Sequence, residues 1–230
     1  MGYRPILCFN WAMTTGYYDI RVCENPACGL RYPLVEGHPF GMRCPLCLGS
    51  TKAVLTRPLS PEPFSPLNEQ NPTPRQRLHA VLDSVRSAWN VGAIFRTADG
   101  LGVEKLYLCG ITPTPENDAV RKTSLGAEET VEWEYARDAV KLTARLKAEG
   151  FALWGLEQDM RSVTLGDSEM GGWQKTDKRI ALILGNEVTG VDPDLLDLCD
   201  RIVHIPMQGK KRSLNVEVAF AIAAWVVNGY

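Results

Sequence analysis

Four cysteines that lie within 25 residues of one another are the first candidates for chemistry in this sequence. They are Cys23, Cys28, Cys44 and Cys47, in two pairs written "CENPAC" and "CPLC". Two such pairs can supply four thiolates in a tetrahedron about 2.3 Å from Zn²⁺, and we therefore predict a structural zinc site. The alternative is four reduced, unliganded thiols, in which case a piece of about 55 residues would lack a core adequate for folding alone.

The residues around these cysteines fit a metal site. Gly29 follows the first pair and Gly49 closely follows the second, and glycine permits the tight turn whose amides face the thiolates. His38 lies between the pairs, but four cysteines already fill a tetrahedron, so we expect His38 to lie on the surface. Cys109 and Cys199 stand alone and are expected to be small buried apolar residues.

Three further clusters combine polar side chains with glycine or helix signals. They are "SAWNVGAIFRTADGLGV" (87–103), "LILGNEVTGVD" (182–192) and "IPMQGKKRSLNVEVA" (205–219). Their candidate side chains are Asn90 and Arg96, then Glu187, then Ser213 and Asn215. Each cluster taken alone has an ordinary interpretation as a helix cap, a solvated helix face or the turn after a strand.

Asn215 is the hardest of these residues to explain by local structure. Ser is a preferred N-cap, so the sequence predicts a helix that begins at Ser213. Asn215 would then occupy the first turn, where asparagine has poor helix propensity and tends to bond its own backbone. Helix propensity therefore does not explain Asn215, and a functional role for its amide is expected.

The pattern around these clusters predicts an α/β fold with a mainly parallel sheet. Strand-like runs at 78–85, 104–111, 131–136, 151–158, 179–187 and 201–207 alternate with helical stretches at 91–102, 137–150, 193–200 and 213–228. Such alternation indicates βαβ units. Ligands bind beyond the carboxyl ends of strands in these sheets, so we expect all three clusters to lie on site loops. We expect Asn90 just before its helix and Gly150 at a helix C-cap.

A proline-rich stretch divides the chain. Residues 56–76 contain six prolines, which favour extended, unpaired backbone and predict a semi-rigid linker. The alternative is an ordered arm lying on the larger domain. The expected organisation is a zinc-ribbon-like module at 1–55, the linker at 56–76 and a larger domain at 77–230.

Composition excludes several classes of protein. The net charge of −2 argues against a strongly basic nucleic-acid binder, so nucleic-acid contacts must depend on local patches such as Lys210, Lys211 and Arg212. No apolar run reaches the roughly 18 residues of a membrane span, and the N-terminus is a poor signal peptide, so we expect a cytoplasmic location without membrane contact. The usual glycine-rich dinucleotide and triphosphate loops are absent.

Taken together, the three clusters resemble the motifs of the SpoU/TrmH-type RNA ribose 2′-O-methyltransferases of the SPOUT superfamily. That family shows N-x-G-x-x-x-R-T-A, then L-G-x-E-x-x-G, then I-P-M followed by S-L-N-V, and all three stand here in the same order. The resemblance covers about residues 77–230 and not the cysteine-containing module. It implies a SPOUT domain with a C-terminal trefoil knot, S-adenosylmethionine bound in the knot loops, and a homodimer.

The resemblance also implies roles for individual residues. The cofactor-binding positions are Gly185, Ile205 and Leu214. The active-site positions are Asn90, Arg96, Glu187, Ser213 and Asn215. Arg96 matches the proposed general base, but a guanidinium is almost always protonated, so binding of the adjacent phosphate is the alternative. Many members have serine after S-L-N-V, where this chain has Glu217.

The expected function is S-adenosylmethionine-dependent methylation of a ribose 2′-hydroxyl in tRNA or rRNA. One alternative is a non-catalytic RNA- or ribosome-binding protein that keeps the fold, but the intact motif residues argue against it. The other is methylation of a base, and the S-L-N-V motif favours ribose. We expect His79 and His204 to have structural roles.

Overall fold

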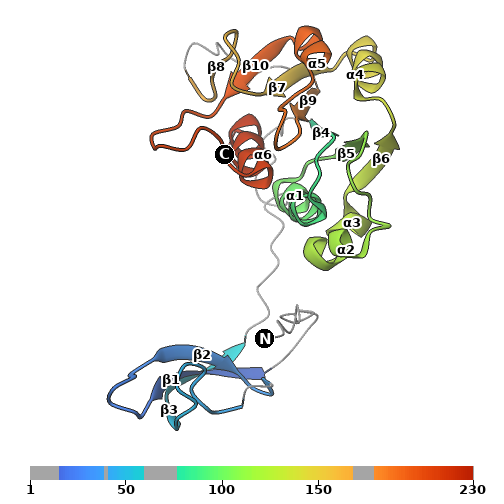
Figure 1. The fold of residues 1–230 in the computed structure, drawn as a ribbon. Helices are drawn as coiled ribbons and strands as arrows, with labels where there is room; N and C mark the ends of the chain where they lie inside the picture. The colour runs from blue at the N-terminus through green and yellow to red at the C-terminus, as the bar shows by residue number, and fades with distance from the viewer. Residues whose placement is uncertain (1–15, 39–40, 60–76, 168–178, 230) are drawn as a thin grey trace. The chain divides into compact units, whose positions relative to one another are not determined.

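The computed structural model describes residues 16–38, 41–59, 77–167 and 179–229 (Figure 1). The chain divides into two compact units, Met1–Asn71 and Pro72–Tyr230. In the described part of the chain, no helix is both long and apolar enough to cross a membrane.

The first unit contains a three-stranded antiparallel sheet in the order β2-β1-β3. Its strands are β1 (Gly16–Cys23), β2 (Arg31–Val35) and β3 (Thr51–Leu59). Residues 56–59, which we expected to open the linker, belong to β3. They pair with the first residues of β1, and these ladder hydrogen bonds outweigh the cost of a proline on an edge strand. The rest of the expected linker lies outside the described residues.

The second unit has seven parallel strands in the order β6-β5-β4-β9-β7-β10-β8. The strands are β4 (Leu78–Asp83), β5 (Lys105–Cys109), β6 (Glu132–Ala136), β7 (Ala152–Leu156), β8 (Val163–Thr164), β9 (Ile180–Leu184) and β10 (Arg201–His204). The helices are α1 (Ala88–Leu101), α2 (Asp118–Ser124), α3 (Ala127–Thr130), α4 (Ala139–Ala148), α5 (Pro193–Leu198) and α6 (Val216–Val227). The predicted α/β fold with a parallel sheet is confirmed.

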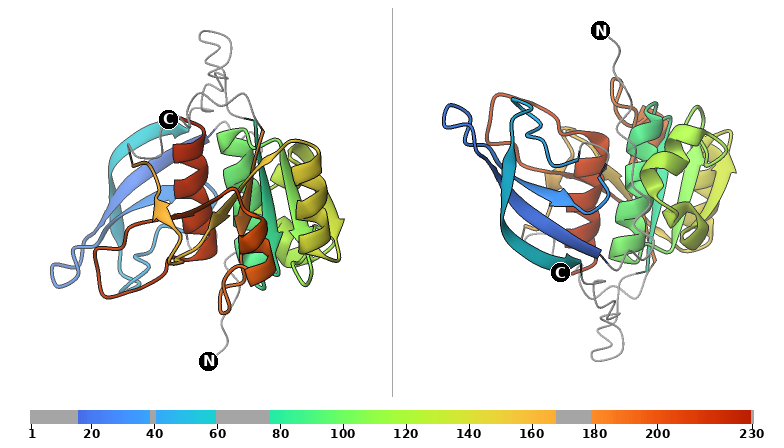
Figure 2. Two further views of the ribbon diagram at one scale, coloured as in Figure 1. Left: turned by 90° about the horizontal axis from the view of Figure 1, so that it is seen from above. Right: turned by 90° about the horizontal axis from the view of Figure 1, so that it is seen from below.

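Helices cover both faces of this sheet. Alternate residues of the interior strand β4 enter different cores: Leu82 packs in the cluster that includes α1 and α6, and Val81 in the cluster that includes α4 and α5. Figure 2 shows α1 and α6 side by side on one face, with α4 on the other. Both faces are therefore apolar, which explains why β4 and β9 are almost uniformly buried.

Two predicted helix starts are wrong by a few residues. Ser87 is the N-cap of α1, so Asn90 lies in its first turn and does not precede the helix. Asn215, and not Ser213, is the N-cap of α6. At the end of α4 the C-cap is Glu149, and Gly150 follows it with a positive φ of 88°.

Candidate active site

A cavity of ≈ 410 Å³ lies where the loops after β7, β9 and β10 meet. These strands are parallel neighbours, so their carboxyl ends share one edge of the sheet. Among the predicted site residues, those that line the cavity are Gly185, Glu187, Ile205, Ser213, Leu214 and Asn215. Two clusters that are separate in sequence therefore form one cavity.

Three polar side chains from all three clusters form a hydrogen-bonded chain beside this cavity. The Asn215 side chain donates from Nδ2 to Oδ1 of Asn90 at 3.1 Å. Asn90 in turn donates from Nδ2 to Oε1 of Glu187 at 3.3 Å. Each residue thus orients the next, and the terminal carboxylate lies on the turn after β9.

Glu187 also joins this turn to the start of α1. The backbone N–H of Arg86 donates to Oε2 at 2.9 Å, and that of Ser87 donates to Oε1 at 3.1 Å. Partial burial opposes ionisation of the carboxyl, but these hydrogen bonds and the one from Asn90 outweigh it, so the pKa of Glu187 lies below its usual value. The side chain is therefore a fixed anion at neutral pH.

Asn215 has a structural role as well as this contact. Its Oδ1 accepts a hydrogen bond from the backbone N–H of Glu217 at 2.8 Å, which caps α6. The predicted place of Asn215 inside the first helical turn is wrong: Asn215 is the N-cap, and asparagine is among the best N-cap residues. The cap uses only the oxygen of the amide, so its nitrogen remains available for Asn90.

The glycines of the motifs allow close backbone approaches. A Cβ on Gly185 would lie 2.2 Å from the backbone of Gly190, with which Asn186 forms a β-bridge. A Cβ on Gly92 would lie 1.9 Å from Oγ1 of Thr123, so this glycine lets α1 and α2 pack closely. These positions therefore fix the site loops.

Asn90 and Arg96 are the predicted site residues that do not line the cavity, but Asn90 is connected to it by its hydrogen bonds with Glu187 and Asn215. Arg96 is exposed on α1, and its side chain makes no hydrogen bond or ion pair to any other described residue. Its neighbour Thr97 faces α6, where its hydroxyl donates to Oε1 of Glu217 at 3.0 Å. Glu217 thus ties α6 to α1 beside the Asn215–Asn90 contact.

The basic loop extends from this site into solvent. Lys210, Lys211 and Arg212 are all exposed, and Arg212 lines the cavity. The loop therefore presents cations next to the proposed nucleotide-binding residues.

Glu157 is a cavity residue that our sequence analysis missed. It lies directly after β7, and its Oε2 accepts a hydrogen bond from the backbone N–H of Val191 at 3.0 Å. A Cβ on Gly190 would lie 2.4 Å from the same oxygen, so that glycine leaves room for the carboxylate. A carboxylate directly after a parallel strand is the signal that could have identified it.

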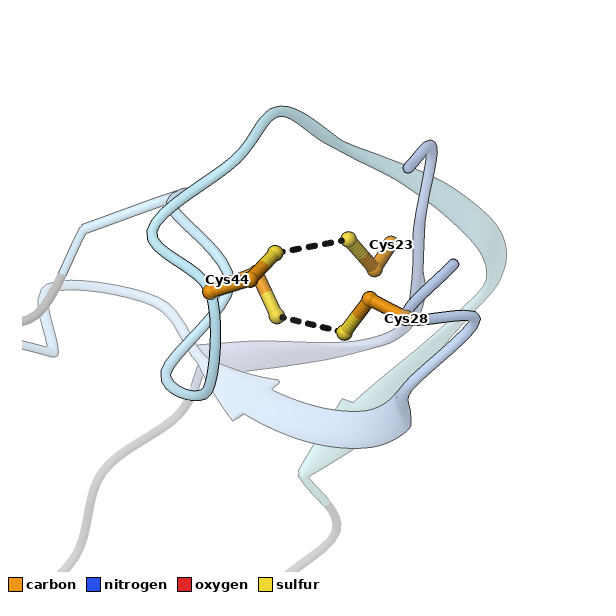
Figure 3. Close-up of side chains that lie close together, drawn as sticks. Cys23, Cys28 and Cys44 are labelled. Atoms are coloured by element: carbon orange, nitrogen blue, oxygen red, sulfur yellow. Dashed lines mark hydrogen bonds between the residues drawn. The ribbon is translucent and has the colours of Figure 1, made fainter. Parts of the chain in front are cut away.

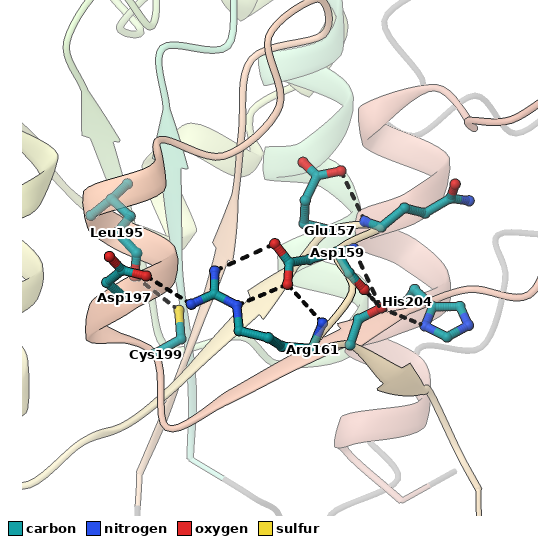
Figure 4. A network of polar contacts seen from close by, with 9 residues as sticks. Glu157, Asp159, Arg161, Leu195, Asp197, Cys199 and His204 are labelled. Carbon is teal, nitrogen blue, oxygen red and sulfur yellow. Dashed lines mark hydrogen bonds and ion pairs between the residues drawn. The ribbon is translucent and has the colours of Figure 1, made fainter.

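His204 anchors the loop that follows Glu157 (Figure 4). Its Nδ1 lies 2.9 Å from Oγ of Ser162, and its Nε2 lies 3.4 Å from Oγ1 of Thr164. In the same loop, Arg161 forms ion pairs with Asp159 and Asp197. His79 is buried between strands and lies 3.2 Å from Glu104. These contacts agree with structural roles for both histidines.

The four clustered cysteines come together in the first unit. Their sulfur atoms all lie within 4.8 Å of one another. Cys23 Sγ lies 3.4 Å from Cys47 Sγ, and Cys28 Sγ lies 3.7 Å from Cys44 Sγ. Figure 3 shows the thiols of Cys23, Cys28 and Cys44 facing one another. A tetrahedron of sulfurs about 2.3 Å from Zn²⁺ has edges of about 3.8 Å, so this donor set fits the ion.

The two turns around the cysteines also fit a metal site. Gly29 and Leu48 have positive φ values of 57° and 60°, so the left-handed residue of the second turn is Leu48 and not the expected Gly49. A Cβ on Gly49 would lie 3.3 Å from Sγ of Cys47, so Gly49 instead leaves room for the thiol. Hydrogen bonds from the backbone of Cys47 and Leu46 lower the pKa of Cys44, whereas burial raises the pKa of Cys23.

Comparison with known proteins identifies relatives of the second unit. The chain is 30% identical over 156 residues to the 23S rRNA (guanosine-2′-O-)-methyltransferase RlmB of Acinetobacter baylyi, covering 65% of this chain and 58% of the relative. It is 30% identical over 151 residues to the 23S rRNA (guanosine(2553)-2′-O)-methyltransferase RlmP of Bacillus subtilis, covering 65% and 57%. The chain therefore spans less than two thirds of the length of these relatives.

Solved structures agree with this relationship. The AdoMet-bound rRNA methyltransferase from Sinorhizobium meliloti superposes with a TM-score of 0.59 at 25% identity, over 71% of this chain and 60% of that one. The A. aeolicus TrmH/SpoU tRNA modifying enzyme gives 0.57 at 28% identity, over 67% and 76%. The SpoU rRNA Methylase family matches residues 77–225, and the chain belongs to that family.

Proposed function

We propose that the protein transfers a methyl group from S-adenosylmethionine to a ribose 2′-hydroxyl of rRNA or tRNA. The observation that carries this proposal is the hydrogen-bonded chain of Asn215, Asn90 and Glu187 beside the cavity. The names of the relatives support the reaction, since two are 2′-O-methyltransferases of 23S rRNA. One of the superposed structures contains AdoMet.

The cavity fits the cofactor. Its volume of ≈ 410 Å³ lies within the roughly 300–1,000 Å³ typical of small-molecule sites. Gly185, Ile205 and Leu214 would hold the cofactor by backbone and apolar contacts, because the close approach at Gly185 leaves no space for a side chain there. When bound, S-adenosylmethionine supplies an electrophilic methyl group.

The polar chain would act on the ribose and its phosphate. Asn90 and Glu187 would orient the 2′-hydroxyl, and Ser213 with Asn215 would hold the nucleotide at the cavity. Arg96 would take the proton of the hydroxyl or bind the adjacent phosphate, both of which position the oxygen for attack. The fixed negative charge of Glu187 suits contact with a guanidinium.

A homodimer accounts for the distance of Arg96 from the cavity. The exposed side of α1 and α6 carries an apolar hollow of ≈ 510 Å³, lined by residues that include Leu101 and Ile222. A second copy covering this face would bury Leu101 and Ile222 and bring Arg96, which lies one helical turn before Gly100 of the same hollow, to the interface. The site would then be completed close to that interface.

A C-terminal trefoil knot is also part of the proposal. The strand β10 pairs with β7 on one side and with β8 on the other, although β8 belongs to the connection between β7 and β9. A later strand between two earlier ones is the arrangement that a threaded chain would produce. Such threading is rare in proteins, and the strand order supports it here.

Structural zinc and a cytoplasmic location complete the proposal. Cys23, Cys28, Cys44 and Cys47 would hold Zn²⁺ and stabilise the zinc-ribbon-like module, which contributes few buried side chains of its own. The cytoplasm would keep the cysteine thiols reduced and therefore able to bind zinc, and it also contains rRNA and tRNA.

Calorimetry with S-adenosylmethionine and a tritiated-methyl assay test the function together. The RNA substrate is bulk RNA from cells in which the gene is deleted. We expect the wild-type protein to bind the cofactor and to label ribose. Arg96→Ala should bind the cofactor normally, because Arg96 lies outside the cavity, but should transfer methyl groups about 10²–10⁴-fold more slowly. Wild-type protein that binds no S-adenosylmethionine would refute the proposal.

A further inference from the structure

One face of the three-stranded sheet combines cations with apolar side chains. Residues paired across antiparallel strands point to the same face. The rows Arg31–Val22–Lys52, Pro33–Ile20–Leu55 and Val35–Tyr18–Arg57 therefore share a face, which we call the outer face. Its edge residues on β2 and β3 are exposed, and those of the central strand β1 are half-buried.

The opposite face is closed by the loop that carries the second cysteine pair. Tyr32 donates from its hydroxyl to the carbonyl of Arg43 at 3.0 Å, and the hydroxyl of Thr51 donates to the carbonyl of Met42. Arg21 lies beneath this loop and is only 6% exposed. The two faces therefore differ: the inner face is covered around Arg21 by the unit's own chain, although Tyr17 farther along it is 57% exposed, and no described contact covers the outer face.

The charges of the unit are also divided between the faces. Arg31, Lys52 and Arg57 lie on the outer face. The described residues of the unit include three carboxylates, and none belongs to the outer-face rows. Asp19 accepts hydrogen bonds from Arg21 and Thr56 on the inner face, Glu36 follows β2, and Glu24 follows β1 in the first cysteine turn.

We propose that the outer face binds a single-stranded segment of RNA. Its cations match the phosphates, and Tyr18 with the apolar side chains beside it provides a surface on which bases stack. The nine residues cover about 14 Å along the strands and about 10 Å across them, similar to sheets that stack two or three bases. Charge complementarity decides the occupant, because a face with three cations and no carboxylate suits a polyanion better than an apolar protein surface.

This inference rests on the proposed function in that the RNA is the methylation substrate. The outer face would bind a segment of the substrate outside the cavity. It would therefore contribute the same binding free energy in the ground state and in the transition state of methyl transfer. Loss of such binding raises KM and leaves kcat unchanged.

Fluorescence anisotropy of full-length protein with a labelled oligouridylate of about 12 nucleotides tests the proposal, since single-strand sites span about 4–16 nucleotides. The triple variant Arg31→Ala, Lys52→Ala, Arg57→Ala should lower the log–log salt slope of binding by about 2, because each phosphate that is no longer neutralised lowers the slope by about 0.7. Arg43→Ala is the control, because Arg43 is an exposed cation of the covering loop and not of the outer face. It should change the salt slope less than the matched single variant Arg57→Ala does.

Tyr18 provides a second and independent variant. Tyr18→Ala should weaken binding by about 5- to 150-fold, whereas Tyr18→Phe, which retains the ring, should bind like the wild type. The zinc content and circular dichroism of each variant show whether the unit is folded. If Tyr18→Ala alone does not fold, the triple variant decides the question.

The outcomes separate this inference from the proposed function. Wild-type protein that binds the oligonucleotide through the outer face but transfers no methyl group would support the inference and refute the function. A triple variant with an unchanged salt slope and an unchanged KM for RNA would overturn the inference, even if methylation is intact. In that case a protein partner, or a second copy detected by light scattering, occupies the face.

Discussion

Replacement of Asn215 separates its two roles. Its Oδ1 caps α6, and its Nδ2 donates to Asn90. Asn215→Asp keeps the cap oxygen and has the same shape, but replaces the donor nitrogen with a second acceptor. Asn215→Ala removes both contacts. The aspartate variant therefore tests the amide contact alone, and the alanine variant tests the cap in addition.

The structure sets the expected magnitudes. Loss of an N-cap costs about 1 kcal/mol, which lowers the melting temperature of a domain of this size by about 2–4 °C. Asn215→Asp should keep the wild-type melting temperature, since a negative charge at a helix N-terminus is favourable. It places a carboxylate oxygen against Oδ1 of Asn90, where 3.1 Å now separates donor and acceptor. Asn90 could turn its amide so that Nδ2 donates to the new carboxylate, but it would then lose the hydrogen bond from Nδ2 to Glu187.

Both variants should therefore lose activity, and only one should lose stability. A net hydrogen bond contributes about 0.5–1.5 kcal/mol, so we expect kcat/KM of Asn215→Asp to fall by about 2- to 13-fold. The assays are thermal unfolding of the full-length protein and tritiated-methyl transfer to RNA that lacks the modification. Full activity of Asn215→Asp would show that the amide is only a helix cap and would remove Asn215 from the site.

Three other predictions follow from the described contacts. Wild-type protein should contain stoichiometric zinc by elemental analysis, and Cys44→Ser should lose it; intact thiols without metal would refute the zinc site. Alanine at Lys210, Lys211 and Arg212 together should lower the salt slope of RNA binding by about 2–3, and an unchanged slope would mean that this loop faces solvent in the complex. Folding lowers the pKa of Glu187, so its carboxylate stabilises the folded protein above the ordinary pKa of the group, and this stabilisation is lost as pH falls below about 4.5. The melting temperature of Glu187→Gln should therefore approach that of the wild type at acid pH.

Much of the second unit could be predicted because its strands are apolar runs between helical stretches. β4 and β9 are buried on both faces; β9 is a continuous apolar run, and β4 is apolar except for His79 and Asp83. The helices α2 and α3 were not predicted. They are short, with 7 and 4 residues, and Leu125 and Gly126 interrupt them with positive φ values, so no helical periodicity can develop.

The site was harder to predict than the fold. The motifs identified Asn90, Glu187 and Asn215, but the contacts between them join residues that are 97 and 125 positions apart. Such distances in sequence carry no local signal. Arg96 is exposed outside the cavity of its own chain, as its ordinary interpretation on a solvated helix face predicts, and not in the site to which the resemblance assigns it. The first unit matched no motif of the family, and the zinc site was predicted from cysteine spacing alone.

The two contacts of Asn215 explain why the residue type is restricted at this position. The N-cap position is favourable for Asn, Asp, Ser and Thr, because their short side-chain oxygens can accept the hydrogen bond from the helix amide. Glycine is also tolerated there without a side-chain oxygen. The contact with Asn90 needs a donor on the same side chain, at a reach of two atoms beyond Cβ. Asp offers no donor, the hydroxyls of Ser and Thr are one atom shorter, and Gly has neither group. Among good caps, only asparagine can hold the start of α6 and orient Asn90 at once. A residue that looked misplaced in a helix is thus the point where the structure of α6 and the geometry of the site are fixed by one amide.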